Sequence, residues 1–281
     1  MSEGGQIFRR ARRERNSSQL LSSVITVVMN DVSGIERTIQ SVLSQDYPNI
    51  EYIVVDGGST DGTLDIIRRY DARLAYWVSE KDSGIYAAMN KGIEHATGAW
   101  LSFINSSDFF YDQATLSVLC SFASKASEGI RLVYGDTLFY DKYQRKIVCM
   151  KTDRIKINMS RVNHQSCLMR NGPWMKYDTS LRLCADHNII YPMVHEGRSI
   201  YVAKCVAIVK ALGKSSNRIR TMREGLQVSF RYGGLTDRML SIASYCYAGL
   251  KWIADITLRP VLGERVFQRF RHSKDTLGAL L

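Results

Sequence analysis

The fold is decided by residues 51–70, which read EYIVVDGGSTDGTLDIIRRY. The first six residues predict a strand that ends at Asp56, and residues 63–70 predict a helix. The glycine-rich turn between them lies where open α/β sheets bind their ligands, at the carboxyl end of a strand. We therefore expect a binding loop here. A tight turn that caps the following helix is the alternative interpretation.

The same order of elements recurs on both sides of this stretch. Apolar runs predict strands at 23–28, 74–79 and 99–104, and helical spacing of apolar residues predicts helices at 34–45 and 83–96. Strands that alternate with helices of this length form βαβ units in a mostly parallel sheet. The rhythm changes after residue 110, where we expect the following elements: helices at 116–126 and 185–196, strands at 131–134 and 199–209, and a hairpin at 137–150.

Length and composition favour one main domain. A chain of 281 residues that is 45% hydrophobic can bury a sizeable core. We expect a basic N-terminal tail at 1–21, a catalytic domain at 22–216 and a helical basic extension at 217–281. The six cysteines form no C-x-x-C pair, which predicts buried thiols in a reducing, cytoplasmic setting and no zinc.

The net charge of +11 belongs to the two ends of the chain. Residues 1–16 hold five arginines against two acids, residues 210–281 hold thirteen basic residues against five acids, and the middle holds twenty of each. Basic ends suit an anionic surface such as phospholipid, a pyrophosphate-linked acceptor or nucleic acid, although a plain solvated surface is an alternative. Segment 239–262 is interrupted by charges, so we expect a core helix or an interfacial helix and not a membrane span.

Three polar motifs follow the ends of successive predicted strands. They are DGGSTDG at 56–62, EKDSGIYAAMNKG at 80–92 and NSSD at 105–108. The second opens a helix, whose N-terminus favours an anionic ligand, and the acid of the third suits a hard divalent cation. Parallel strands end at the same edge of a sheet, so one crevice would gather all three motifs.

Together with VITVV at 24–28 and TGAW at 97–100, these motifs resemble the inverting family-2 glycosyltransferases, most closely the branch that builds bacterial surface polysaccharides. The resemblance runs from about residue 22 to 216. It implies an α/β fold of the GT-A type, which is a Rossmann-like, mostly parallel sheet flanked by helices. It also implies a nucleotide-sugar donor, with UDP favoured because an acid at Asp56 suits uracil N3–H.

The resemblance also implies roles for individual residues. The set expected to bind the nucleotide or donor is Val27, Asn30, Asp56, Gly58, Ser59, Asp82, Tyr86, Asn90, Lys91 and Ser107. His164 and Gln165 would contact the donor or acceptor sugar, and Asp186 would be the base. Asp108 would bind Mg²⁺ or Mn²⁺ as the last acid of a D-x-D motif. Here Ser106 and Ser107 precede it, so only one carboxylate is present and metal dependence stays open.

The reaction implied is transfer of a sugar, with inversion, to a saccharide or a lipid-pyrophosphate-linked acceptor. The place implied is the cytoplasm, on the inner face of the cytoplasmic membrane. The neutral core lacks a nucleic-acid-binding motif, so we expect no nucleic-acid partner. One rival is a non-catalytic nucleotide-binding protein that acts at a membrane or on nucleic acid. Another is a nucleotidyltransferase, but residues 22–34 lack the basic glycine-rich loop expected of that class.

Overall fold

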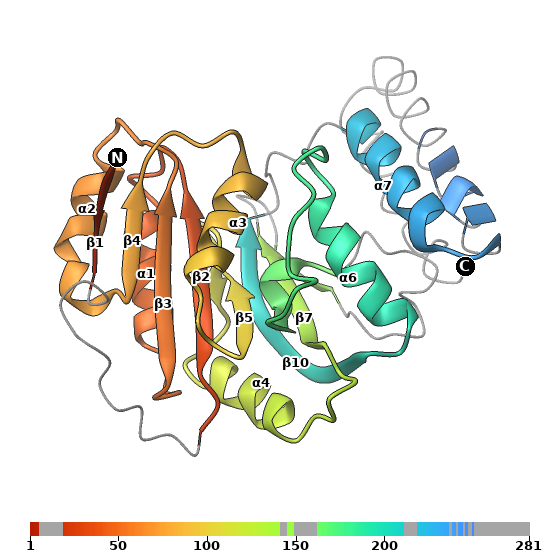
Figure 1. Ribbon diagram of the computed structural model, residues 1–281, viewed down its shortest axis with the longest axis horizontal. Coiled ribbons are helices and arrows are strands. Elements are labelled where there is room, and N and C mark those ends of the chain that lie inside the picture. The colour runs from red at the N-terminus through yellow and green to blue at the C-terminus, as the bar shows by residue number, and fades with distance from the viewer. Residues whose placement is uncertain are drawn as a thin grey trace. The chain divides into compact units, whose positions relative to one another are not determined.

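The computed structural model describes residues 1–5, 19–140, 145–148, 162–210, 218–235 and several residues between 238 and 249. The chain forms two compact units, Met1–Gly233 and Gly234–Leu281. The sheet, its helices and every site residue discussed below belong to the first unit (Figure 1). No helix in the described part of the chain combines the length and apolar composition of a membrane span.

The first unit is built on a ten-stranded sheet in the order β1-β4-β3-β2-β5-β9-β7-β10-β6, with β8 paired to β7. Strands β4, β3, β2 and β5 are parallel neighbours, which confirms the predicted parallel core. The strands are β1 (Ser2–Gly4), β2 (Ser22–Val28), β3 (Ile50–Asp56), β4 (Tyr76–Ser79), β5 (Trp100–Phe103), β6 (Phe109–Phe110), β7 (Leu132–Tyr140), β8 (Arg145–Val148), β9 (Cys167–Arg170) and β10 (Ser199–Lys210).

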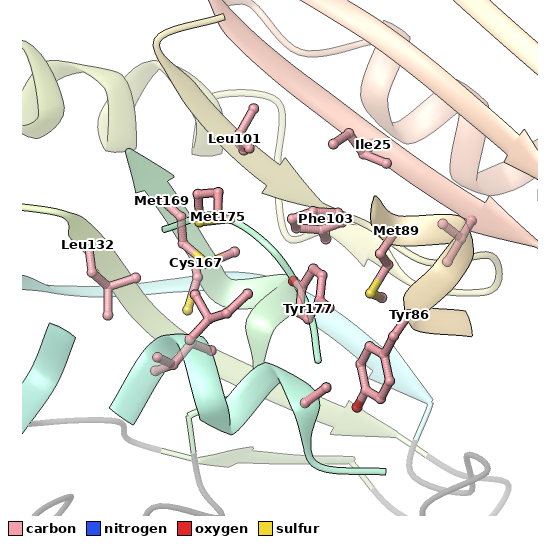
Figure 2. Packing of buried hydrophobic residues seen from close by; sticks show 14 of the residues in the cluster. Ile25, Tyr86, Met89, Leu101, Phe103, Leu132, Cys167, Met169, Met175 and Tyr177 are labelled. Carbon is pink, nitrogen blue, oxygen red and sulfur yellow. The ribbon is translucent and has the colours of Figure 1, made fainter. Parts of the chain in front are cut away.

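Helices cover both faces of this sheet. They are α1 (Ile35–Leu43), α2 (Thr63–Arg69), α3 (Ile85–His95), α4 (Thr115–Ser124), α6 (Ala185–His195) and α7 (Arg218–Tyr232). Apolar residues of α1, α2 and α4 form one buried cluster with the sheet, and those of α3 and α6 form a second (Figure 2). Successive residues of β2 enter the two clusters alternately, Val24 one and Ile25 the other. A strand buried on both faces has this continuous apolar sequence.

Four elements depart from the expected plan. Two short strands were not predicted: β6, which lies antiparallel to β10, and the four-residue β9, which lies antiparallel to both β5 and β7. Residues 2–4, expected in a tail, pair with β4 as β1. Helix α7, expected in a separate extension, belongs to the first unit because its inward residues Glu224 and Val228 are buried.

Other expectations have mixed outcomes. The predicted hairpin is confirmed by the pairing of β7 with β8, although its turn at 141–144 lies outside the described residues, as does most of segment 239–262. Cys120, Cys167 and Cys184 are buried free thiols, as predicted. Cys246 is exposed, so burial does not extend to every described cysteine.

One buried charge ties the amino ends of the central strands together. The Glu51 side chain of β3 is only 3% exposed. It accepts hydrogen bonds from the Ser23 hydroxyl of β2 (2.6 Å) and from the backbone N–H (2.7 Å) and hydroxyl (2.6 Å) of Thr97, in the loop before β5. A buried carboxylate is tolerated when donors surround it in this way.

We predict that Glu51→Gln destabilises the protein. A glutamine amide turns an N–H group toward donors that need an acceptor, so at least one buried donor loses its partner, at a cost of about 1–3 kcal/mol. Denaturant unfolding measures the change. The control is Asp65→Asn, since Asp65 is 79% exposed and makes only a surface ion pair with Arg68. Equal stability of both variants would contradict the prediction.

Candidate active site at the carboxyl edge of the sheet

The loops that follow the parallel strands are joined by backbone hydrogen bonds. Glu80, after β4, donates to the carbonyl of Asp56 at the end of β3 (3.0 Å). Ser106, after β5, donates to the carbonyl of Val27 near the end of β2 (3.1 Å). The three motifs expected to share one edge of the sheet are therefore neighbours in space.

The first polar group centres on Asp56, which is fully buried. One carboxylate oxygen accepts the backbone N–H of Ser59 (3.0 Å) and the hydroxyl of Ser79 (2.6 Å), and the other accepts the Ser59 hydroxyl (2.5 Å). Asn30 donates its backbone N–H to Ser59 (2.7 Å). The turn needs Gly58, whose φ of +82° disfavours a side chain. Asp56, Asn30, Gly58 and Ser59 thus form one ordered polar loop.

Two residues expected to bind the donor make contacts within the scaffold. Val27 is 5% exposed and packs in the core cluster that includes residues of α3. In a strand covered by helices on both faces, successive side chains point alternately toward the two layers of helices. Asn90 donates its amide to the carbonyl of Tyr177 (2.9 Å) and accepts the backbone N–H of Tyr177 (2.7 Å). Asn90 therefore fixes the 177 segment against α3.

Lys91 is held between two acids of the second motif. Its ammonium lies 2.6 Å from Asp82 and 2.7 Å from Glu80. Burial lowers the pKa of Lys91, but these two partners outweigh it and raise the pKa above the ordinary value. Lys91 therefore remains a cation. The second carboxylate oxygen of Asp82 is buried without a hydrogen-bond partner in the described part of the chain.

Asp108 is the acid of the third motif and is 6% exposed. Its carboxylate accepts the side-chain amide of Gln165 (2.7 Å) and the backbone N–H of Lys210 (3.1 Å). Burial raises the pKa of Asp108 to about 6, although both hydrogen bonds oppose that rise. The nearby charge of Asp31 raises it further.

Asp31 is a site residue that the sequence did not reveal. One of its carboxylate oxygens accepts the hydroxyls of Ser106 (2.6 Å) and Ser107 (2.7 Å), the two serines that precede Asp108. Gly34 packs so tightly on this group that an added Cβ would overlap the Ser107 hydroxyl. The acid missing from the D-x-D position is thus matched by a carboxylate from the loop after β2. The two serines before Asp108, where the motif has an acid, were the feature of the sequence that could have indicated an acid supplied from another loop.

Backbone strain marks the same place. Asn30 and Ser107, with φ of 51° and 70°, are the non-glycine residues of the described chain that have positive φ. Each such residue costs about 1–3 kcal/mol, and strain of this kind concentrates at functional sites.

The oxygen atoms around Asp108 fit a hard cation that is shared with a ligand. Among the described residues no group of three or more His, Cys, Asp or Glu side chains forms a complete metal cage. Asp108, Asp31 and the buried, unpartnered amide oxygen of Gln165 are nevertheless oxygen donors of the kind that Mg²⁺ and Mn²⁺ prefer. Mg²⁺ commonly takes one or two carboxylates and completes its shell with phosphate and water.

The third polar group joins His164 to Asp186. The Nδ1 atom of His164 lies 3.2 Å from one carboxylate oxygen of Asp186, and its Nε2 atom lies 3.2 Å from the Asn105 amide nitrogen. The Asn105 amide thus lies against Nε2, and Nδ1 is the ring nitrogen that faces Asp186. Tyr86 donates to the other Asp186 oxygen at 3.3 Å. His164, Tyr86 and Asp186, all predicted site residues, therefore meet.

Asp186 stays ionised in this setting. Burial raises its pKa, but His187 and His164 outweigh burial and lower the pKa to about 2. Burial and the charge of Asp186 raise the pKa of Tyr86, which stays protonated and donates. The rings of Tyr86, Phe103 and Tyr177 pack on one another beneath this group (Figure 2). The Asp186 carboxylate, which would take the proton of an acceptor, is only 13% exposed and is held from two sides.

A protein-family model described as Glycosyl transferase family 2 matches residues 23–193, more than half of the 281 residues. The chain belongs to glycosyl transferase family 2. The matched segment contains every site residue named above except Lys210, whose backbone alone contributes.

Relatives of this glycosyltransferase occur in two bacterial groups. A glycosyltransferase of Mycobacterium tuberculosis is 48% identical over 31% of this chain and 34% of its own length. A PGL/p-HBAD biosynthesis glycosyltransferase of Mycobacterium bovis is 32% identical over 53% of this chain and 59% of its own. A Bacillus subtilis glycosyltransferase assigned to teichuronic acid biosynthesis is 44% identical over 31% of this chain and 36% of its own. The chain therefore spans about a third to three-fifths of these relatives.

Solved structures share the fold. The mannosyltransferase PcManGT of Pyrobaculum calidifontis, in complex with GDP-Man and Mn²⁺, superposes with a TM-score of 0.63 at 19% identity, covering 94% of this chain and 81% of that one. S. aureus TarS in complex with UDP-GlcNAc gives a TM-score of 0.60 at 18% identity, covering 75% and 66%. These matches confirm the expected α/β fold with a mostly parallel central sheet flanked by helices.

We predict that Asp108→Asn stabilises the ligand-free transferase at neutral pH. The native state holds the Asp108 proton up to about pH 6, whereas an unperturbed aspartate releases it near 3.8. Between these values the native state binds more protons than the unfolded state, so the free energy of unfolding falls as pH rises. The variant avoids this loss, worth about 1–3 kcal/mol, and the unpartnered Gln165 oxygen can rotate to accept its new N–H.

Denaturant unfolding of both proteins in EDTA, at pH 4 and pH 7.5, measures the effect. The stability difference should be present at pH 7.5 and vanish at pH 4. A difference that is the same at both pH values would show that the Asp108 carboxyl is not the group responsible.

Proposed function

We propose that this chain transfers a sugar from a nucleotide-diphosphate sugar to a saccharide or lipid-linked acceptor, with inversion of the anomeric carbon. The observation that carries the proposal is the link between two polar groups. His164 and Gln165 are adjacent, and the first reaches Asp186 while the second reaches Asp108. An ionised carboxylate that can take a proton is thereby fixed beside the acid suited to a diphosphate and its cation.

The nucleoside end of the donor would occupy the Asp56 loop. Asp56 is buried and its carboxylate is ordered by serine hydroxyls, so a base N–H would take the place of one of these serine hydrogen bonds. A uracil N3–H fits this acceptor, and TarS is a neighbour in complex with UDP-GlcNAc. PcManGT is in complex with GDP-Man, so guanine is the alternative that a binding assay must compare.

The diphosphate would lie near Asp108 and Asp31 with a divalent cation. Bound there, Mg²⁺ or Mn²⁺ would neutralise the charge that develops on the leaving diphosphate. Of this chain's own groups, Asp108 and Asp31 would hold the cation, while Ser106 and Ser107 fix the direction of the Asp31 carboxylate.

Asp186 would remove the proton from the acceptor hydroxyl. Tyr86 and His164 contact different oxygens of Asp186, so an acceptor hydroxyl can replace the Tyr86 hydrogen bond while His164 keeps the carboxylate in place. The deprotonated hydroxyl attacks the anomeric carbon on the face opposite the diphosphate, which leaves with its electron pair. A single displacement inverts the anomeric configuration.

The test is turnover of radiolabelled UDP-, TDP- and GDP-sugars with a pool of lipid-linked acceptors, with and without EDTA. Release of free nucleotide diphosphate together with a labelled acceptor supports the proposal. Nucleotide binding without any transfer supports the rival, a non-catalytic nucleotide-binding protein. Full activity in EDTA would show that the reaction does not need the cation.

We predict that Asp186→Asn abolishes most turnover and leaves donor binding unchanged. Asparagine keeps the shape of the side chain but cannot take the proton, and a general base typically contributes ~10²–10⁴-fold to rate. Turnover assays and calorimetry with the nucleotide measure the two properties separately. Weakened nucleotide binding with turnover retained at saturating donor would instead make Asp186 a donor ligand.

We also propose that the basic ends bind the anionic inner face of the cytoplasmic membrane, where a lipid-linked acceptor of surface polysaccharide or glycolipid synthesis would reside. The relatives assigned to teichuronic acid and PGL/p-HBAD biosynthesis support this setting. The charges of residues 1–16 and 210–281 account for the whole excess of +11.

Co-sedimentation with anionic vesicles should therefore fall when residues 234–281 are removed, because this segment carries seven Lys/Arg against four acids. A truncation after Gly233 keeps α7, which belongs to the first unit. Binding by the full chain should weaken with salt, since charges are screened beyond ~8 Å at physiological ionic strength. Equal binding to neutral vesicles would contradict an electrostatic attachment.

A further inference from the structure

Helix α7 lies beyond the family-matched residues 23–193, yet one of its acids is buried against the helix that carries Asp186. Glu224 is 5% exposed. One of its carboxylate oxygens accepts three successive backbone N–H groups, those of Arg182 (3.0 Å), Leu183 (2.7 Å) and Cys184 (3.1 Å). Cys184 is the N-cap residue of α6, and its own side chain makes no capping hydrogen bond.

We propose that Glu224 is the positioning residue for Asp186, because it fixes the backbone from which the first turn of α6 begins. This inference rests on the proposed role of Asp186 as the base. The N–H group of a helix N-cap residue has no partner within the helix, and the N–H groups of the two residues that lead into it likewise need an acceptor from elsewhere. Here an acid about forty residues away in the chain supplies it, and Asp186 lies two residues beyond the last N–H that Glu224 binds.

The charge of Glu224 suits this task. Burial raises its pKa, but the three N–H groups and Arg220 outweigh burial and lower it, so the carboxylate is ionised. An anion near a helix N-terminus is favourable, and hydrogen bonds to a charged acceptor are about twice as strong as neutral ones. Burial and the nearby charges of Asp186 and Glu224 raise the pKa of the Cys184 thiol to about 12. The thiol therefore stays protonated.

Without Glu224, Asp186 would have competing partners. Its carboxylate already interacts with the backbone N–H of His187. If the N–H groups of 182–184 lost their acceptor, the Asp186 carboxylate would be the nearest anion on the same helix end. It could then turn from His164 and Tyr86 toward the backbone. Glu224 thus leaves Asp186 free to point into the site.

The experiment compares Glu224→Gln with Glu196→Gln in the full chain. Glu196 is the same residue type at the opposite end of α6, where it makes a surface pair with Arg198 at 2.9 Å. Amide hydrogen exchange should accelerate at 182–184 in Glu224→Gln and stay at the wild-type rate in Glu196→Gln. Turnover with acceptor should fall about 10- to 100-fold in Glu224→Gln only, the size expected for a misplaced catalytic group. Affinity for UDP should not change.

A double variant separates positioning from general stability. In an Asp186→Asn background, Glu224→Gln should change the remaining turnover by less than about twofold, because the group it positions is already disabled. An equal fold-loss in both backgrounds would overturn the proposal, as would unchanged exchange at 182–184. If the wild-type protein transfers no sugar at all, the proposed function fails. The exchange rates alone then decide whether Glu224 holds this loop.

Discussion

The arrangement of the site depends on one short turn. Residues 164–166 form a single 3₁₀ turn that leads into β9, and the side chain of Asn163 caps it by accepting the backbone N–H of Gln165 (3.1 Å). In this turn two adjacent side chains diverge, His164 toward Asp186 and Gln165 toward Asp108. One peptide unit thus links the side chains that bind the carboxylates of Asp186 and Asp108. Strand β9 holds that unit by pairing with both β5 and β7.

The second constraint is electrostatic. Asp31 and Asp108 approach closely enough for the charge of one to raise the pKa of the other. The first acid of a D-x-D motif that ends at Asp108 would occupy position 106 and lie against Asp31, where like charges repel. Ser106 donates a hydrogen bond to Asp31 at that position instead. Asp31 therefore supplies, beside Asp108, the second carboxylate that position 106 lacks.

The sequence predicted the parallel core because strands and helices alternate there with clear periodicity. It also predicted which loops share the functional edge, since parallel strands end together. It missed β9, since the four residues CLMR carry no measurable period. It gave no indication that Asn90 anchors the backbone of Tyr177, because an amide can bond a ligand or a backbone equally well. The partners of Asn90 lie 87 residues away, and only the folded chain brings them together.

Helix α7 shows why the end of a family match need not be the end of the catalytic structure. Its exposed residues include Arg220 and Arg223, and its buried residues include Glu224 and Val228. The basic composition of this region predicts a surface role. It does not indicate that Glu224 is buried, because a single buried glutamate produces no periodic pattern in the sequence. Yet Glu224 satisfies the amide groups at the start of α6. The helix that anchors the start of α6 therefore also presents positive charge to the solvent, and a cut at residue 217 would remove both.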